Sequence, residues 1–390
     1  KKHAIPFAFH DLSVVSGREE IQSRADAIEA GVWQHKVDIT VNPLKLNLIR
    51  FSDAETELII SYHHIILDGW SNAILLKEML QIYEMLEQGI EPDMAKGTRF
   101  KEFVKWRLLH DKNTSIQFWR EYLKGYDFQR DPRKVQGQTH PPGRNIEYTH
   151  MLDRQFLGQI RQFAQSSQIT MAAFFYTIWG LFQLKIAGAS DIVFGFTVSG
   201  RPPEITGIEN MVGLFINTLP LRIQAGSRTR VMDTMKQVNA DLIELKKYQI
   251  MQMSEIFNLF GMRTDNLKSA VVIQNYSVHK SLLNPGGKKI HLYTSRYATN
   301  LDMVLGIKVF GDNVQFDFNY NDQQYTGDQV RHFCGAIIQL IHQIMESNPL
   351  ELAFHDIELN EAAGQPETTD TIQRNIDILE DIRGVDFEIF

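Results

Sequence analysis

The sequence has very little cysteine and lacks the features of an exported protein. Cys334 is the single cysteine among 390 residues, so no intramolecular disulfide can form. Its setting in "RHFCGAIIQLIHQI" predicts an apolar position of an amphipathic helix. The first residues, "KKHAIPFAFHDLS", lack the apolar core and cleavage site of a signal peptide. We therefore expect a cytoplasmic protein.

The chain also lacks a long apolar run and a strong charge imbalance. The most apolar segment, "TMAAFFYTIWGLFQLKIA" from Thr170, is interrupted by Gln183 and Lys185, which predicts a buried helix and no membrane partner. Net charge is −7, and the last thirty residues contain eight acidic residues against Arg374 and Arg383. The nearly neutral remainder argues against a nucleic acid partner.

What the chain does contain is enough apolar sequence for two cores, with 43% hydrophobic residues. Alternation predicts strands over 43–53 and 56–64, followed by a helix over 71–86 with Ser71 as its N-cap. That helix has one apolar stripe, formed by Leu75, Met79, Ile82, Tyr83 and Leu86. Two further helical segments end at Gly125.

The second half alternates between strand and helix patterns. A polar segment over 127–145, broken by Pro and Gly, separates the halves. Beyond it the patterns predict helices over 170–187, 230–251 and 327–347, and strands over 191–200, 211–223, 269–278, 289–295, 301–310 and 314–322. The prediction is an α/β protein with an N-terminal lobe at 1–140, a C-terminal lobe at 141–360 and an acidic linker or tail at 361–390.

The stretch "SYHHIILDGWS", Ser61 to Ser71, lies where a predicted strand is followed by a predicted helix. Successive residues of a strand point to opposite faces, so His63 and His64 should look in different directions. We expect His63 to face inward and His64 to face a cleft, with Asp68 and Gly69 in the turn that follows.

Three interpretations of these residues compete. His63, His64 and Asp68 are all metal-ligand types, but their opposed directions and the lack of further ligands disfavour a metal site. Both histidines could instead be ordinary residues with satisfied hydrogen bonds. In the third interpretation, an imidazole with a pKa of about 6.5 accepts a proton during acyl transfer near neutral pH.

The segment "HHIILDG" resembles the HHxxxDG signature of condensation domains of nonribosomal peptide synthetases, which are relatives of chloramphenicol acetyltransferase. Three more segments resemble family signatures in the same order: "FKEFVKW", "TVSGRPPEITGIENMVG" and "GLFINTLPLR", the last matching GxFVNTxxxR. The resemblance covers roughly Lys1 to Leu359.

The resemblance implies two chloramphenicol-acetyltransferase-like α/β sandwich lobes that form a V around a central tunnel. Upstream (donor) and downstream (acceptor) peptidyl carrier protein domains would deliver substrates there on 4'-phosphopantetheine, beside a neighbouring adenylation domain. The acceptor amine would attack the donor thioester to form a peptide bond in antibiotic biosynthesis. The domain itself would bind no cofactor and no metal.

The resemblance also assigns roles to residues. As catalytic residues, His64 would orient the amine and accept its proton, Asp68 would pair with an arginine to hold the loop, and Gly69 would offer its N–H to the developing oxyanion. The supporting residues would be His63, Trp70, Asn217, Arg222 and Ser199. Asn217 would donate into the tunnel and Arg222 would form a salt bridge. Ser199 would shape a loop, because the nucleophile pattern G-x-S-x-G is absent around it.

The sequence departs from the family pattern before "KKHAIPFAFHDLS", where neither the SxAQxRLW-like nor the RHExLRTxF-like motif occurs. The second motif supplies the usual arginine partner of the motif aspartate. Without a cation, a buried Asp68 would cost on the order of several kcal/mol or take up a proton. Two alternatives therefore stay open: an epimerization domain, which uses the same motif, and a non-catalytic platform for carrier docking.

Overall fold

The computed structural model describes residues 4–34, 37–93, 97–128, 143–274, 299–310, 313–348 and 350–359. The chain divides into two compact units. Unit 1 comprises the described residues of Lys1–Leu76, Ala95–Phe100 and Ile205–Phe215, and unit 2 comprises those of Lys77–Met94, Lys101–Glu204 and Ile216–Phe390. The predicted division at residue 140 lies between the strands of the first sheet and those of the second. The compact units differ from it, because unit 2 also contains Lys77–Met94 and the residues from Lys101 to 140, and unit 1 also contains Ile205–Phe215.

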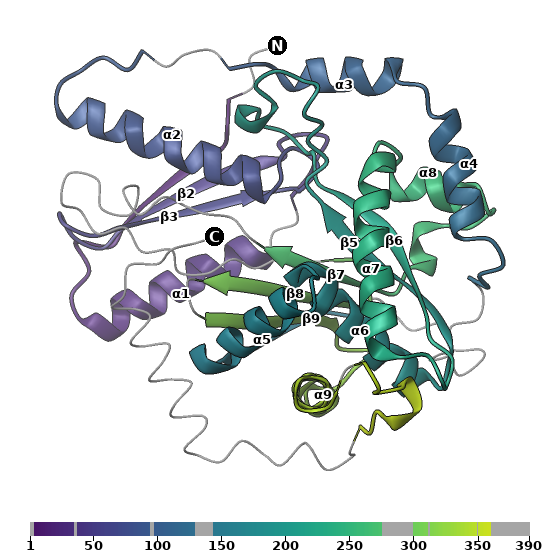
Figure 1. The fold of residues 1–390 in the computed structure, drawn as a ribbon. Coiled ribbons are helices and arrows are strands. Elements are labelled where there is room, and N and C mark those ends of the chain that lie inside the picture. The colour runs from purple at the N-terminus through teal and green to yellow at the C-terminus, as the bar shows by residue number, and fades with distance from the viewer. Residues whose placement is uncertain are drawn as a thin grey trace. The chain divides into compact units, whose positions relative to one another are not determined.

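Unit 1 contains a three-stranded sheet in the order β1-β2-β3 (Figure 1). Strand β1 (Phe7–Asp11) is parallel to β2 (Leu44–Arg50), which is antiparallel to β3 (Thr56–Tyr62). Helix α1 (Arg18–Gln34) contributes Ala25 to a small core with Leu12 and Ile49. Strands β2 and β3 were predicted, whereas the sequence patterns considered above did not identify β1 or α1.

Strand β3 ends at Tyr62, one residue before the two histidines. Tyr62 pairs with Leu44, and the residue before Leu44 is Pro43. Pro43 accepts a hydrogen bond from the His63 N–H at 2.9 Å but has no N–H with which to extend the ladder. The chain then turns, with the Ile66 N–H donating to the His63 carbonyl at 3.2 Å. The prediction that both histidines belong to a strand is therefore wrong.

Helix α2 (Gly69–Glu87) begins two residues earlier than predicted. The Asp68 carboxylate accepts a hydrogen bond from the Ser71 N–H at 2.8 Å, which is the usual bond from an N-cap to the third helical residue. The N-cap is therefore Asp68 and not Ser71. The predicted stripe is amphipathic as expected, but four of its residues are exposed at the surface: Leu75, Met79, Tyr83 and Leu86.

Unit 2 contains a six-stranded mixed sheet in the order β4-β9-β8-β7-β5-β6. Its strands are β4 (Asn145–Leu152), β5 (Asp191–Val198), β6 (Asn217–Gln224), β7 (Ser269–Gln274), β8 (Met303–Phe310) and β9 (Asn313–Asn321). Strand β7 is parallel to β5 and β8, and the other pairs are antiparallel. The sheet is therefore mixed, and β4 was not among the predicted strands.

The remaining described elements are helices and 3₁₀ turns, and all of them except η1 lie mainly in unit 2. They are α3 (Phe100–Leu109), α4 (Asn113–Tyr122), α5 (Arg154–Ser166), α6 (Met171–Ala187), α7 (Val231–Leu245), α8 (Met253–Asn258) and α9 (Gly327–Glu346). The 3₁₀ turns are η1 (Ile208–Asn210), η2 (Lys246–Tyr248), η3 (Thr264–Asn266) and η6 (Phe354–Asp356). The two helical segments predicted before Gly125 and the predicted helices at 170–187, 230–251 and 327–347 are confirmed, and α5 was not predicted.

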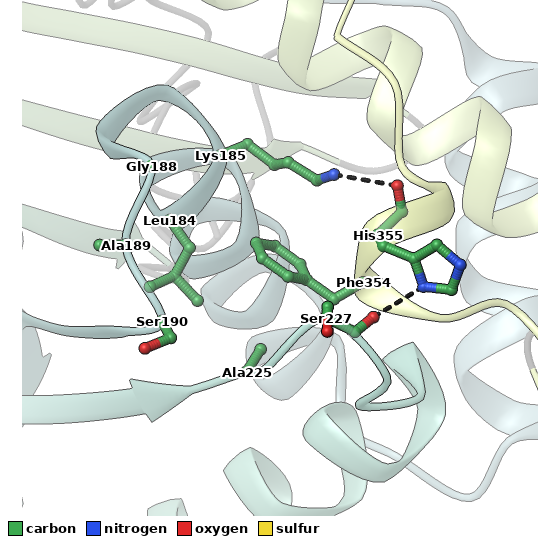
Figure 2. A pocket seen from close by; sticks show the side chains of 9 residues that line it. All are labelled: Leu184, Lys185, Gly188, Ala189, Ser190, Ala225, Ser227, Phe354 and His355. Carbon is green, nitrogen blue, oxygen red and sulfur yellow. Dashed lines mark hydrogen bonds between the residues drawn. The ribbon is translucent and has the colours of Figure 1, made fainter.

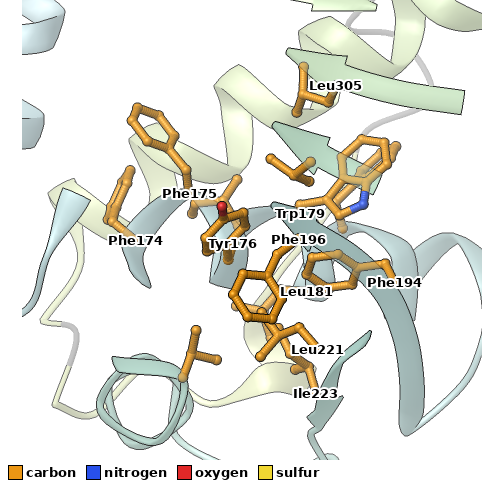
Figure 3. Close-up of a cluster of buried hydrophobic side chains, with 14 of the residues drawn as sticks. Phe174, Phe175, Tyr176, Trp179, Leu181, Phe194, Phe196, Leu221, Ile223 and Leu305 are labelled. Atoms are coloured by element: carbon orange, nitrogen blue, oxygen red, sulfur yellow. The ribbon is translucent and has the colours of Figure 1, made fainter. Parts of the chain in front are cut away.

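Helix α6 is the centre of the core of unit 2, as Figure 3 shows. Thr170 caps its start by accepting the Ala173 N–H at 3.1 Å, and Gly188 ends it in the left-handed conformation. Every residue from Ala173 to Leu184 is buried. A helix that is enclosed in this way has no solvent-facing side, which explains why it is apolar all round. Its aromatic side chains meet those of β5, including Phe194 and Phe196.

The amphipathic pattern of α9 is also confirmed. Its buried residues include Val330, Ile337 and Ile341, and Cys334 is a buried free cysteine among them. Among the described residues no single helix is long and apolar enough to cross a membrane, although α5 and α6 pass that test together across a bend of 102°. The predicted strand at 289–295 and the acidic tail at 361–390 lie outside the described residues.

Candidate active site

His63 and His64 lie in the turn between β3 and α2, and both are exposed. The ring of His64 meets that of Tyr62 edge-on, with centroids 6.3 Å apart. Burial raises the pKa of Tyr62, and the negative charge of Asp68 raises it further. The chain therefore presents one imidazole at the surface, beside a phenol that stays protonated near neutral pH.

His63 does not face inward as predicted. Because it lies beyond the end of β3, the alternation of a strand no longer determines its direction. Its Nδ1 accepts a hydrogen bond from the Ile65 N–H at 3.1 Å. The ring is therefore exposed and yet supports the backbone of the turn that contains His64.

Asp68 is buried, with 2% of its surface exposed. Its Oδ1 accepts the Ser71 N–H at 2.8 Å, and its Oδ2 accepts the Phe215 N–H at 2.9 Å. These two donors and the positive end of the α2 dipole stabilise the carboxylate. The sequence suggested that Asp68 would depend on an arginine for this purpose, and the structure adds backbone donors that sequence reasoning missed.

Gly69 and Trp70 form the first turn of α2. The Gly69 N–H is one of the first four of the helix, which have no acceptor within it. Trp70 Nε1 donates to the Glu209 carbonyl at 2.9 Å, so the indole joins this turn to the segment before Phe215. The supporting role that the resemblance implied for Trp70 stays a prediction.

Ser71 makes a contact that the sequence gave no reason to expect. Its hydroxyl donates to the Gly213 carbonyl at 2.7 Å and accepts the Gly213 N–H at 3.0 Å. Gly213 and Phe215 belong to the segment "GLF" that resembled a family signature, but sequence spacing alone could not show that it lies against α2. Both segments belong to unit 1.

Asn217 and Arg222 lie on β6 in unit 2, where both have backbone partners. Asn217 Nδ2 donates to the carbonyls of Gln249 at 2.9 Å and Met251 at 2.7 Å. Both protons of its amide group are therefore used, so the expected hydrogen bond into a tunnel is wrong. Asn217 instead anchors the segment that follows α7.

Arg222 forms the salt bridge that was predicted. Its Nε and Nη2 donate to the two carboxylate oxygens of Asp191 at 3.0 and 2.7 Å. Its Nη1 donates to the carbonyls of Tyr122 and Lys124. The hydrogen bonds to Asp191 raise the pKa of the guanidinium above its usual range. Ser199 is exposed directly after β5, beside Gly200 with its positive φ of 62°, which fits a role in loop geometry.

A pocket of about 370 Å³ in unit 2 contains none of the predicted site residues (Figure 2). Lys185 Nζ points across it to the His355 carbonyl at 3.3 Å and lies 4.8 Å from the centre of the Phe354 ring. Burial lowers the pKa of Lys185. In the described part of the chain, no group of three or more His, Cys, Asp or Glu side chains could hold a metal ion.

Solved structures similar to this chain define the fold. The X-domain from teicoplanin biosynthesis has a TM-score of 0.76 and 15% identity, over 92% of this chain and 82% of that one. A starter condensation domain of rhizomide synthetase has a TM-score of 0.73 and 18% identity, over 92% and 81%. Both indicate an α/β fold of the chloramphenicol acetyltransferase type with two sheets and helices.

A family model described as "Condensation domain" matches residues 1–357, and the chain belongs to this family. Tyrocidine synthase 3 of Brevibacillus parabrevis is 30% identical over 83% of this chain, and bacitracin synthase 3 of Bacillus licheniformis is 29% identical over 83%. The chain spans only 5% of the length of each of these relatives. The family resemblance inferred from HHxxxDG is therefore confirmed.

Proposed function

We propose that this chain forms an amide bond between a donor acyl or peptidyl thioester and the amine of an acceptor aminoacyl thioester. Both substrates would arrive on 4'-phosphopantetheine arms of peptidyl carrier domains in nonribosomal peptide synthesis. The observation that supports this most directly is the exposed imidazole of His64 on a turn fixed at both ends. An imidazole accessible from solvent and held in place suits proton transfer to a large incoming substrate.

The reaction needs little from the protein beyond placement and one proton acceptor. The acceptor nitrogen attacks the thioester carbonyl, the C–S bond breaks, and an amide and a free thiol result. The amine has a pKa of about 8 in its free form, so part of it is already neutral near pH 7. His64 would take the proton that the nitrogen loses and return it to the leaving sulfur.

The remaining residues have supporting roles in this proposal. Gly69, in the first turn of α2, would donate its N–H to the oxyanion that forms on the carbonyl. Asp68 would act by holding that turn, since its two carboxylate oxygens are engaged by Ser71 and Phe215. The neighbouring adenylation domain and the two carrier domains would be supplied by the longer synthetase.

The starter condensation domain of rhizomide synthetase has been crystallised with compounds of the kind that this proposal requires as substrates. A variant of that starter condensation domain was crystallised with C8-CoA and Leu-SNAC, which are an acyl thioester and an aminoacyl thioester analogue. The same pair of chemical groups is what the proposed reaction requires, although the likeness at 18% identity extends to the fold alone.

The test is amide formation between two charged carrier domains, measured by intact mass. We expect the wild-type chain to move the donor acyl group onto the acceptor carrier and His64→Ala to lower the rate by about 10²–10⁴-fold, the usual contribution of a general base. His332→Ala is the matched control, because it removes an exposed imidazole from α9 in unit 2. Equal rates for wild type and His64→Ala would contradict the proposal.

The second candidate is a non-catalytic platform. The X-domain of teicoplanin biosynthesis, which has the same fold, was crystallised in a complex with OxyB. If neither wild type nor His64→Ala forms amide while carriers still bind, the platform is favoured. If deuterium from D₂O enters the α-carbon of a carrier-bound aminoacyl group without amide formation, the epimerization alternative is favoured.

A further inference from the structure

Hydrogen bonds join the residues at the start of α2 to a segment that lies far away in the sequence. The Asp68 N–H donates to the Gly213 carbonyl at 3.2 Å, and the Asp68 carboxylate accepts the Phe215 N–H. The Ser71 hydroxyl bonds both the N–H and the carbonyl of Gly213. Trp70 adds its bond to Glu209. We call residues 68–71 and 209–215 the clasp.

Ser71 is fully buried within the clasp. Its relative exposure is 0%, compared with 2% for Asp68 and 3% for Phe215. Hydrogen bonds in such a place do not compete with water, and a donor or acceptor left without a partner is costly there. Met211 of the clasp, also 0% exposed, and Leu67 just before it add buried apolar surface.

Gly213 can lie against Phe100 only because it has no side chain. A Cβ on this residue would lie 2.0 Å from Cδ2 of Phe100, whose ring also packs edge-on against Phe215 at 5.1 Å between centroids. Gly213 is therefore in contact with the Phe100 ring and is bonded through both of its backbone groups to the Ser71 hydroxyl.

We propose that Ser71 is a positioning residue for His64. The turn from His63 to Asp68 is fixed at its first end by the bond from His63 to Pro43 and at its second end by Asp68. Gly213 and Phe215 both bond Asp68, and the Ser71 hydroxyl holds Gly213 through both of its backbone groups. The consequence for the rate of amide formation rests on the proposed function, whereas the consequence for the loop does not.

A hydroxyl is well suited to this position because it donates and accepts at once. Alanine would lose both bonds while keeping the helix. Cysteine would keep a similar shape with a weak donor and a weak acceptor, and so should fall between serine and alanine. Ser115 in α4 is a matched control, since it is another buried serine, 5% exposed, in unit 2.

The first measurement is amide hydrogen exchange of the full chain. We expect Ser71→Ala to speed exchange of the Gly213 and Phe215 amides about tenfold, with Ser71→Cys between it and wild type. Ser115→Ala should leave these two amides unchanged. The His64 ring signal in NMR, assigned by its loss in His64→Ala, should shift or broaden in Ser71→Ala and not in Ser115→Ala.

The second measurement is the rate of amide formation. We expect Ser71→Ala to lower kcat about tenfold while KM for the acceptor thioester stays within about twofold, because the substrate still binds but meets a less ordered imidazole. Unchanged exchange at Gly213, or faster exchange with unchanged His64 signal and kcat, would overturn the proposal. If the wild type forms no amide, the proposed function fails, and exchange and NMR still decide whether Ser71 positions His64.

Discussion

Unit 1 and unit 2 both place helices on a sheet, but they are held together in different ways. In unit 1 the core beside α1 contains three buried residues, Leu12, Ala25 and Ile49, and the β1 residues Phe7 and Phe9 are exposed. In unit 2 one continuous core extends from α4 to η6 and encloses α6 completely. The unit that contains HHxxxDG has the smaller core of the two.

The difference shows how the turn that contains HHxxxDG can be fixed mainly by hydrogen bonds. His64 lies between the end of β3 and the clasp, where backbone and side-chain hydrogen bonds define the geometry. Buried hydrogen bonds are directional, whereas apolar contacts are not. We therefore expect apolar substitutions to affect unit 2 most and polar substitutions to affect the site most.

The largest effect on stability should come from a phenylalanine of unit 2. Phe194→Ala on β5 removes a side chain that is 0% exposed, and we expect it to lower the free energy of unfolding by about 3–5 kcal/mol. Phe9→Ala on β1, where the side chain is 53% exposed, should change it by less than about 0.5 kcal/mol. Denaturant unfolding followed by circular dichroism measures the free energy of unfolding of both variants. Similar losses in Phe194→Ala and Phe9→Ala would contradict the claim that the two units differ in apolar packing.

A polar substitution should distinguish the clasp from an ordinary helix cap. Asp68→Ala leaves two buried N–H groups without their acceptor, at about 1–3 kcal/mol for each. Asp153→Ala at the start of α5 removes one capping bond, to Phe156 at 2.7 Å, and should cost about 1 kcal/mol. Amide exchange near residue 215 should rise only in Asp68→Ala, and a rise in both variants would count against the clasp.

The smallest effect should come from a charged cluster in unit 2. Burial acts to raise the pKa of Glu255, but Lys112, the Gln252 N–H and Arg107 outweigh it, so this pKa is lowered. Because the folded-state pKa is below the unfolded one, the cluster stabilises the fold at neutral pH, and that contribution is lost as the pH falls below about 4.3 towards the folded-state value.

Glu255→Gln should therefore lower stability at pH 7 by up to about 1 kcal/mol and make the fall below pH 4.3 shallower. Glu121→Gln is the control, because its ion pair with Lys124 is exposed. Melting temperatures of wild type and both variants, measured from pH 7 to below pH 4.3, give the pH dependence of stability. An equally steep loss of stability with acid in Glu255→Gln and wild type would exclude a contribution from Glu255.

Periodicity predicted the elements of unit 2 well and the surroundings of α2 poorly. The stripe of α9 is buried and that of α2 is exposed, although both have the same spacing. Spacing defines which side chains share a face, whereas burial depends on a partner elsewhere in the chain. The V-shaped arrangement with its tunnel stays a prediction from the family resemblance.

The sequence motif predicted which residues belong to the candidate site but not which partners hold them. The HHxxxDG residues and the salt bridge of Arg222 were recognised, but the direction of His63 was wrong because Pro43 stops the ladder on the neighbouring strand. The Phe215 donor to Asp68 and the acceptors of Asn217 were missed, since 147 and more than thirty residues separate these partners. Local patterns contain no information about such pairs.

The bond from Phe215 to Asp68 also has a consequence for biosynthesis on the ribosome. Asp68 is translated 147 residues before its donor, which at about 5–20 residues per second is a wait of roughly 7–30 s. During that interval the nascent chain already contains both histidines, while the start of α2 lacks its bonds to Gly213 and Phe215. The turn that contains His64 can thus gain these contacts only many seconds after the strand that precedes it has been synthesised.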